Sequence, residues 1–189
     1  MKRIRTLDIC LCAMFAALSA VGAFIKVPIP ICPFTLQLTF TTLAGLLLGG
    51  KRGALSVAIY VIIGLLGVPV FTEGGGIYYV LKPTFGYLVG FIAGTYVTGT
   101  IAWGSEEPSY IRIFLASIAG LVIAYLFGMV YMYIICNFVL DQAMGVQTAI
   151  TTCFVLLMPK DIVLAAITSA IAKRLIPIFR KKLEGGEGA

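Results

Sequence analysis

The chain has 189 residues, of which 60% are hydrophobic and 12% are charged, and its mean hydropathy is +1.05. Soluble domains carry about 25% charged residues, so this composition excludes an ordinary soluble domain and predicts one integral membrane domain over residues 1–189. The sequence contains no histidine, which removes the commonest general base and metal ligand. We therefore expect a protein that is not an enzyme and that needs no cofactor or metal ion.

Six apolar stretches approach the length of a membrane-spanning helix, which is about 20 residues. They cover Leu7–Ile25, Leu36–Gly49, Ala54–Val68, Phe85–Ala102, Ile111–Phe138 and Pro159–Phe179. The second and third stretches are short, and the fifth is long enough to tilt or to protrude from the bilayer. The sequence therefore predicts an all-α integral membrane protein whose six transmembrane helices form one bundle.

The first stretch carries two overlapping rows of alanines spaced four residues apart. Ala13 and Ala17 form one row, and Ala16 and Ala20 form the other. Small residues at this spacing allow another helix to approach closely. The neighbouring helix belongs either to the same bundle or to a partner subunit that covers a free face of this helix.

The segment from Val27 to Gln37 reads VPIPICPFTLQ and contains three prolines within six residues. Proline removes a backbone N–H group and interrupts a helix, and unsatisfied backbone groups are costly in lipid. We therefore expect a stiff loop at the membrane surface or buried in protein, in which Thr35 and Gln37 face a solute.

A glycine cluster and several aromatic residues lie between the third and fourth stretches. The glycines that follow Glu73 allow many backbone conformations, so this segment is either a flexible surface turn or a lid whose backbone approaches a ligand. Tyr79 and Tyr87 are either anchors at the membrane interface or walls of a ligand pocket. Phe71 and Gly75 are further candidates for contact with a ligand, as is Glu73.

The fourth and fifth stretches contain further rows of small residues. Gly86, Gly90 and Gly94 form the first row, and Ala116, Gly120, Ala124 and Gly128 form the second. Such rows favour close helix packing within the bundle.

The sixth stretch begins with Pro159, Lys160 and Asp161. Proline and an acidic residue in the first turn are typical of a helix N-terminus, so a structural role explains them. A charged residue at membrane depth is also usually functional, and a helix that began near Thr148 and bent at Pro159 would place the carboxylate deeper. In that position the carboxylate accepts hydrogen bonds from N–H groups of a bound solute.

Lysine and arginine residues near the ends of the stretches predict the orientation of the chain. Eleven lie on the side of the two termini, and three, Lys26, Lys82 and Lys160, lie on the other side. This bias predicts that both termini are cytoplasmic, with a basic tail from about residue 180. The net charge of +6 follows mainly from this bias, so we expect contact with membrane lipid and not with nucleic acid.

The three outer connections are longer and richer in aromatic and amide residues than the two inner ones. Binding residues concentrate in loops that a rigid scaffold positions. We therefore expect a concave site that opens outward.

Several motifs occur together in one order along the chain. They are P-x-P-x-x-P-F-T-L-Q, L-A-G-L-L-L-G-G-K-R-G, G-V-P-V-F-T with a glycine cluster, P-T-F-G-Y-L and M-P-K-D. In this combination the chain resembles the BioY family, the biotin-binding S components of energy-coupling factor (ECF) transporters. The resemblance covers nearly the whole chain and implies a six-helix subunit of a prokaryotic plasma membrane that captures biotin from outside.

The resemblance also implies partners, namely a transmembrane coupling subunit and two ATPase subunits. In that family an alanine row in the first helix contacts the coupling subunit, and Ala13 with Ala17, or Ala16 with Ala20, fits this role. The implied transport step is toppling of the whole S component, driven by ATP hydrolysis in the other subunits.

By the same resemblance, Asp161 matches the acidic residue of a P-x-D-x-x-K motif, which contacts the polar ring of biotin. The third residue after Asp161 is Leu164 in place of the lysine, while Lys160 is adjacent but about 100° away around the helix. We place Lys160 with Asp161 among the expected substrate contacts. Other polar residues that could complete this half of the site are Gln37, Tyr79 and Lys82.

Two alternatives to biotin capture remain open from the residues alone. One is an S component for a different vitamin, which competition between vitamins would identify. The other is a stand-alone secondary transporter, which would take up its solute without ATPases and would be inhibited by an ionophore.

Overall fold

The computed structural model describes residues 5–27, 34–140, 144–151 and 157–184. These residues form mainly α-helices, together with one 3-10 helix and one pair of two-residue strands. In chain order the elements are α1 (Thr6–Phe24), β1 (Lys26–Val27), β2 (Phe34–Thr35), α2 (Gln37–Leu48), α3 (Gly50–Leu65), η1 (Ile77–Leu81), α4 (Phe85–Trp103), α5 (Tyr110–Phe138), α6 (Val146–Ile150) and α7 (Met158–Glu184).

Each of the six apolar stretches overlaps one of the helices α1, α2, α3, α4, α5 and α7. Four of these, α1, α4, α5 and α7, are long and apolar enough to cross a membrane, whereas α2 and α3 are shorter. The third helix begins at Gly50 and not at the predicted Ala54, because Gly49 alone makes the turn from α2 with a φ of +80°. The last helix continues five residues beyond the predicted Phe179, with Pro177 inside it.

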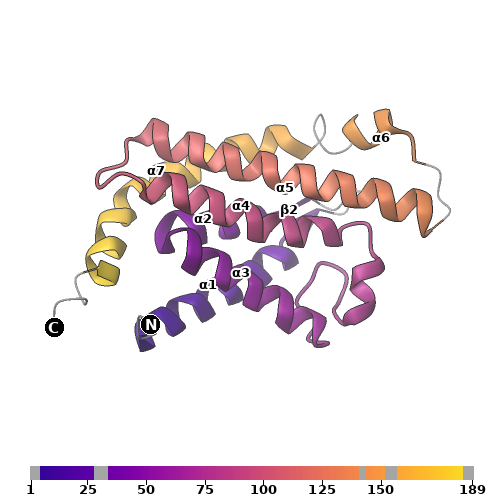
Figure 1. The fold of residues 1–189 in the computed structure, drawn as a ribbon, viewed down its shortest axis with the longest axis horizontal. Coiled ribbons are helices and arrows are strands. Elements are labelled where there is room, and N and C mark those ends of the chain that lie inside the picture. Colours follow the sequence, from indigo (N-terminus) through magenta and orange to yellow (C-terminus); the bar gives the residue numbers. More distant parts are fainter. Residues whose placement is uncertain (1–4, 28–33, 141–143, 152–156, 185–189) are drawn as a thin grey trace.

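The helices run mainly along the long axis of the molecule (Figure 1). The beginning of α1 and the end of α7 lie at the same end, where the Arg5 guanidinium donates a hydrogen bond to the carbonyl oxygen of Leu183. The helices η1 and α6 lie toward the opposite end. This arrangement separates the strongly basic end of the chain from the segments with the candidate binding residues.

The predicted packing of the small-residue rows is confirmed for α4 and α5. A Cβ atom on Gly94 would lie 2.5 Å from the carbonyl oxygen of Gly120, and one on Gly90 would lie 2.7 Å from that of Ala124. The two backbones therefore approach so closely that a larger residue at either glycine would force the helices apart.

The two alanine rows of α1 face different surroundings. Ala16 is buried in the interior and Ala20 packs against the same cluster, whereas Ala13 and Ala17 are exposed. Packing within the bundle therefore uses one row and leaves the other on the surface.

The proline-rich loop lies only partly within the described residues. Pro28, Pro30 and Pro33 lie outside them, so the expectation of a stiff loop is not addressed there. At its ends β1 pairs antiparallel with β2, with Lys26 opposite Thr35. This pairing brings the end of α1 next to the beginning of α2.

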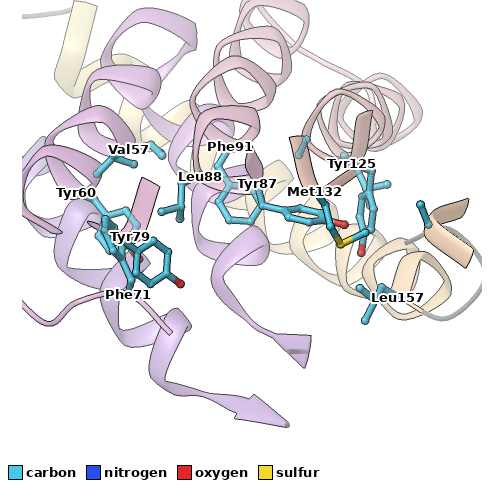
Figure 2. Packing of buried hydrophobic residues seen from close by; sticks show 14 of the residues in the cluster. Val57, Tyr60, Phe71, Tyr79, Tyr87, Leu88, Phe91, Tyr125, Met132 and Leu157 are labelled. Carbon is cyan, nitrogen blue, oxygen red and sulfur yellow. The ribbon is translucent and has the colours of Figure 1, made fainter. Parts of the chain in front are cut away.

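Buried side chains form two clusters along the bundle. One packs Phe15 of α1 against Leu46 of α2 and Ile176 of α7. The other is rich in aromatic residues and extends from Tyr60 of α3 to Tyr125 of α5 (Figure 2). The aromatic cluster forms the floor and walls of the candidate site.

Candidate functional site

A cavity of about 550 Å³, including its part that is open to solvent, lies among β2, α2, η1, α4, α5 and α7. Its lining residues are Thr35, Gln37, Leu38, Thr72, Tyr79, Thr84, Tyr87, Leu88, Phe91, Tyr125, Leu157, Lys160 and Asp161. Small-molecule sites are mostly apolar with a few polar groups that orient the ligand, and this lining has that character.

Asp161 is the acidic residue of this cavity and is only 4% exposed. The Tyr125 hydroxyl of α5 donates a hydrogen bond to Asp161 Oδ2 over 2.5 Å. Asp161 Oδ1 forms an ion pair with Lys160 Nζ over 2.9 Å and is not otherwise hydrogen-bonded among the described residues. The protein therefore holds one carboxylate oxygen by a hydrogen bond and the other by an ion pair, and the ion-paired oxygen retains capacity to accept a hydrogen bond from a ligand.

Lys160 connects the beginning of α7 to the beginning of α2. Its ammonium group donates a hydrogen bond over 2.8 Å to the carbonyl oxygen of Thr35, in addition to the ion pair with Asp161. The Cα–Cβ bonds of Lys160 and Asp161 point in different directions around the helix. The lysine side chain is long enough to compensate for this, so both residues line the same cavity.

Gln37, the first residue of α2, is 3% exposed and belongs to a chain of hydrogen bonds. Its Nε2 donates over 3.1 Å to the Tyr60 hydroxyl of α3. That hydroxyl donates over 3.1 Å to the carbonyl oxygen of Val70, in the segment between α3 and η1. The amide thus has a fixed partner on the side away from the cavity.

Four aromatic residues line the cavity, namely Tyr79, Tyr87, Phe91 and Tyr125. Figure 2 shows these four side chains within the buried aromatic cluster. Tyr79 of η1 contacts Phe71 with ring centroids 4.5 Å apart, and Tyr87 meets Tyr125 edge to face at 5.8 Å. Burial raises the pKa of Tyr79 above its usual value, so its hydroxyl stays neutral and can donate a hydrogen bond at physiological pH. This hydroxyl lies 3.4 Å from Thr84 Oγ1.

Charged side chains lie close to the cavity at Thr72, and this edge is called the rim. Lys26 donates a hydrogen bond to the carbonyl oxygen of Thr72, which is a lining residue. Glu73 pairs with Lys82 at 3.0 Å, and both side chains are about half exposed. These contacts join the β1–β2 region and the segment before η1 at the same rim.

Six of the nine residues expected to contact a substrate lie together in the cavity wall. These are Thr35, Gln37, Tyr79, Tyr87, Lys160 and Asp161. Phe71 lies behind Tyr79, Glu73 lies at the surface, and a Cβ on Gly75 would meet the carbonyl oxygen of Val68 at 2.2 Å. These three residues support the wall or the rim and do not line the cavity.

Tyr125 is the most informative lining residue that sequence reasoning did not identify. It lies beside Ala124 in the small-residue row of α5, where a tyrosine resembles any other apolar residue of the helix. The available signal was Asp161 itself, because a carboxylate at membrane depth requires a partner. Leu38, Leu88, Phe91 and Leu157 were also missed, since apolar wall residues do not differ in sequence from core residues.

Leu164 does not line this cavity. It faces a smaller cavity of about 220 Å³, which also contacts Asp161 and lies among α2, α5 and α7. Thr39 lines this smaller cavity, and its buried hydroxyl has no hydrogen-bond partner among the described residues.

The arrangement suits recognition of a molecule with an apolar body and a polar head. Aromatic and leucine side chains supply the apolar wall, while a carboxylate, an ammonium group and an amide are concentrated at one end. In the part of the chain that the structure describes, no group of three or more cysteine or acidic side chains could hold a metal ion.

Comparison with known proteins gives consistent matches over most of the chain. The chain matches the BioY family over residues 1–181. It is 45% identical over 180 residues to a protein of Lysinibacillus sphaericus named "Probable biotin transporter BioY", covering 95% of this chain and 92% of that protein. It is 38% identical over 172 residues to the "Biotin transporter BioY" of Thermotoga maritima, covering 90% of this chain and 94% of that protein.

The fold is similar to that of a crystal structure described as the S-component for biotin from an ECF-type ABC transporter. The TM-score is 0.76, and the match covers 92% of this chain and 94% of the other, with 22% sequence identity. At this identity the similarity concerns the fold alone.

Proposed function

Since this chain belongs to the BioY family, we propose that it is the biotin-binding S component of an ECF transporter and captures biotin at the outer face of the membrane. The names of its relatives, which are biotin transporters, support this proposal. The protein recognises its solute and does not transform it.

The observation that carries the proposal is the polar cluster at one end of the aromatic cavity. Biotin has a ureido ring with two N–H groups and one carbonyl oxygen, fused to an apolar thioether ring with an acyl chain. Asp161 accepts from an N–H group through its available oxygen, and Lys160 provides the positive charge nearby. The apolar part of biotin packs against Leu88, Phe91 and Tyr87, which belong to the wall.

In this proposal six helices, α1–α5 and α7, cross the plasma membrane, and both termini are cytoplasmic. The charge bias of eleven inner against three outer lysines and arginines supports this orientation. So does the contact between Arg5 and Leu183, which places the beginning of α1 and the end of α7 on one side. The helices α2 and α3 are shorter than a full span, and in this proposal neighbouring helices shield their ends from lipid.

The partners of the proposed complex are a transmembrane coupling subunit and two ATPase subunits. The contact surface for the coupling subunit is the exposed alanine row of α1, formed by Ala13 and Ala17. Exposed Met14 and Val21 extend this surface on the same helix. Ala16 and Ala20 face the bundle and contribute only indirectly.

Calorimetric titration of the purified protein in detergent with biotin tests the substrate. We expect saturable binding with one site per chain, which other water-soluble vitamins in excess do not displace. Displacement of biotin by another vitamin at equal concentration would refute the proposed specificity. Uptake by proteoliposomes that lack coupling and ATPase subunits, abolished by an ionophore, would instead indicate a secondary transporter.

A further inference from the structure

We propose that Tyr60 is a positioning residue that fixes the orientation of the Gln37 amide, so that the cavity presents a second hydrogen-bond acceptor to the ligand. Tyr60 is not a lining residue of the cavity, whereas Gln37 is. The identity of the ligand in this inference depends on the proposed function, while the orientation of the amide does not.

The orientation follows from the number of protons available. A tyrosine hydroxyl has one proton, and a backbone carbonyl oxygen can only accept a hydrogen bond. Because Tyr60 donates its proton to the carbonyl oxygen of Val70, its own oxygen can only accept from Gln37. The NH₂ group of Gln37 must therefore point toward Tyr60, and the amide oxygen Oε1 remains for the cavity.

Packing around Tyr60 holds its side chain, and therefore its hydroxyl, in one position. Tyr60 is 2% exposed, and its ring meets that of Phe71 edge to face at 5.5 Å. The Phe71 ring is seated against Gly64 of α3, where a Cβ atom would lie 2.1 Å from it. Helix α3 and the segment after it thus hold the hydroxyl between Gln37 and Val70.

The consequence is a defined pattern of hydrogen-bonding groups in the cavity. Gln37 Oε1 and the available oxygen of Asp161 are both acceptors, and they belong to residues that line the same cavity. A ligand with two N–H donors on one rigid ring, such as a cyclic urea, satisfies both acceptors. A ligand that presents a carbonyl oxygen to Gln37 is disfavoured, because that oxygen and Gln37 Oε1 are both acceptors and repel each other.

The orientation can be tested without any ligand by NMR of protein labelled with ¹⁵N-glutamine. The chain has three glutamines, Gln37, Gln142 and Gln147, so the Gln37 side-chain signals can be assigned from their loss in Gln37→Ala. We expect slow hydrogen exchange of the Gln37 NH₂ group, and fast exchange with a changed chemical shift in Tyr60→Phe. Equally fast exchange in both proteins would overturn the inference, whatever the protein binds.

Binding tests the consequence for recognition. Tyr60→Phe keeps the ring against Phe71 and removes only the hydroxyl, so we expect biotin affinity to fall by about 3- to 10-fold. Two biotin analogues, each methylated at one ureido nitrogen, separate the two N–H contacts. The analogue that lacks the N–H donor to Gln37 should bind the unaltered protein and Tyr60→Phe with equal affinity. An equal loss for biotin and for both analogues would show a general structural effect and would overturn the inference.

Tyr131→Phe is the matched control. The Tyr131 hydroxyl of α5 also donates to a backbone carbonyl oxygen, that of Val80 in η1, over 2.5 Å. Neither Tyr131 nor Val80 lines the cavity, so we expect unchanged biotin affinity. If the unaltered protein binds no biotin but its Gln37 amide is protected, the proposed function fails and the fixed amide orientation stands.

Discussion

Replacing Asp161 by alanine removes the only acidic side chain among the lining residues of the cavity. The Tyr125 hydroxyl loses its hydrogen-bond acceptor, and the Lys160 ammonium group loses its ion-pair partner, a carboxylate that is 4% exposed to solvent. A ligand N–H group that reaches the available carboxylate oxygen would lose its acceptor as well. We therefore expect Asp161→Ala to weaken biotin binding through the polar head of the ligand.

The magnitude follows from the cost of leaving a buried hydrogen-bonding group without its partner, which is about 1–3 kcal/mol. This range corresponds to an increase in Kd of about 5- to 150-fold. Asp161→Asn should give a smaller loss, because the asparagine keeps the shape and one acceptor oxygen but loses the charge beside Lys160.

Isothermal titration calorimetry with biotin and with desthiobiotin measures the effect. Desthiobiotin keeps the ureido group and lacks the sulfur, so both ligands should lose affinity by the same factor. Asp8→Ala is the matched control, because Asp8 also pairs with a cation, Arg52 at 3.1 Å, but lies in the first turn of α1 at the other end of the bundle. We expect the control to bind biotin as the unaltered protein does.

Two results would refute this reasoning. One is biotin affinity in Asp161→Ala within twofold of the original value, which would remove the carboxylate from the binding site. The other is an equal loss of affinity in Asp8→Ala, which would indicate damage to the fold. Thermal unfolding of both variants in detergent separates loss of fold from loss of contact.

Three further outcomes are expected. Gly94→Val should lower the free energy of unfolding by about 1–3 kcal/mol, because the new side chain meets a carbonyl oxygen of α5. Gly145→Ala should not lower it, because its new Cβ has only a contact at 3.8 Å, and thermal unfolding of the two variants tests this difference. Lys26→Ala should weaken binding of biotin more than that of its uncharged amide, since an ammonium group at the rim attracts the carboxylate; equal losses in titrations of both ligands would contradict this. Ala17→Trp should leave biotin binding intact but prevent co-purification with the coupling subunit, whereas Ala170→Trp, at an exposed position of α7, should leave both unchanged. Co-purification retained in both variants would exclude the α1 row as the contact surface for the coupling subunit.

The positions of the main helices could be predicted closely because apolar stretches are bounded by charges, glycines and prolines. The bounds of α1, α4 and α5 differ from the predicted ones by at most one residue. The beginning of α3 was predicted four residues too late, because Lys51 and Arg52 suggested a polar turn. A single glycine with positive φ makes that turn, and composition does not reveal such a backbone conformation.

The segment between α3 and α4 shows why part of the wall could not be predicted. Nothing in its sequence predicts that Ile77–Leu81 forms a 3-10 helix, which turns Tyr79 inward. Gly74 and Gly76 adopt positive φ angles, whereas Gly75 packs against the end of α3. Three adjacent glycines allow many backbone conformations, so tertiary contacts decide which one the segment adopts.

The pairing of Lys160 with Asp161 depends on side-chain length more than on helical angle. Adjacent residues differ by about 100° around a helix, which suggests that only one of them can face a site. Lys160 lies in the first turn of α7, and its flexible side chain brings Nζ to within 2.9 Å of the carboxylate. The same ammonium group holds Thr35, so the cation that balances Asp161 also fixes the beginning of α2. Leu164, in contrast, lines the smaller cavity, which Asp161 also lines but Thr35 does not, so the residue that makes this connection is Lys160.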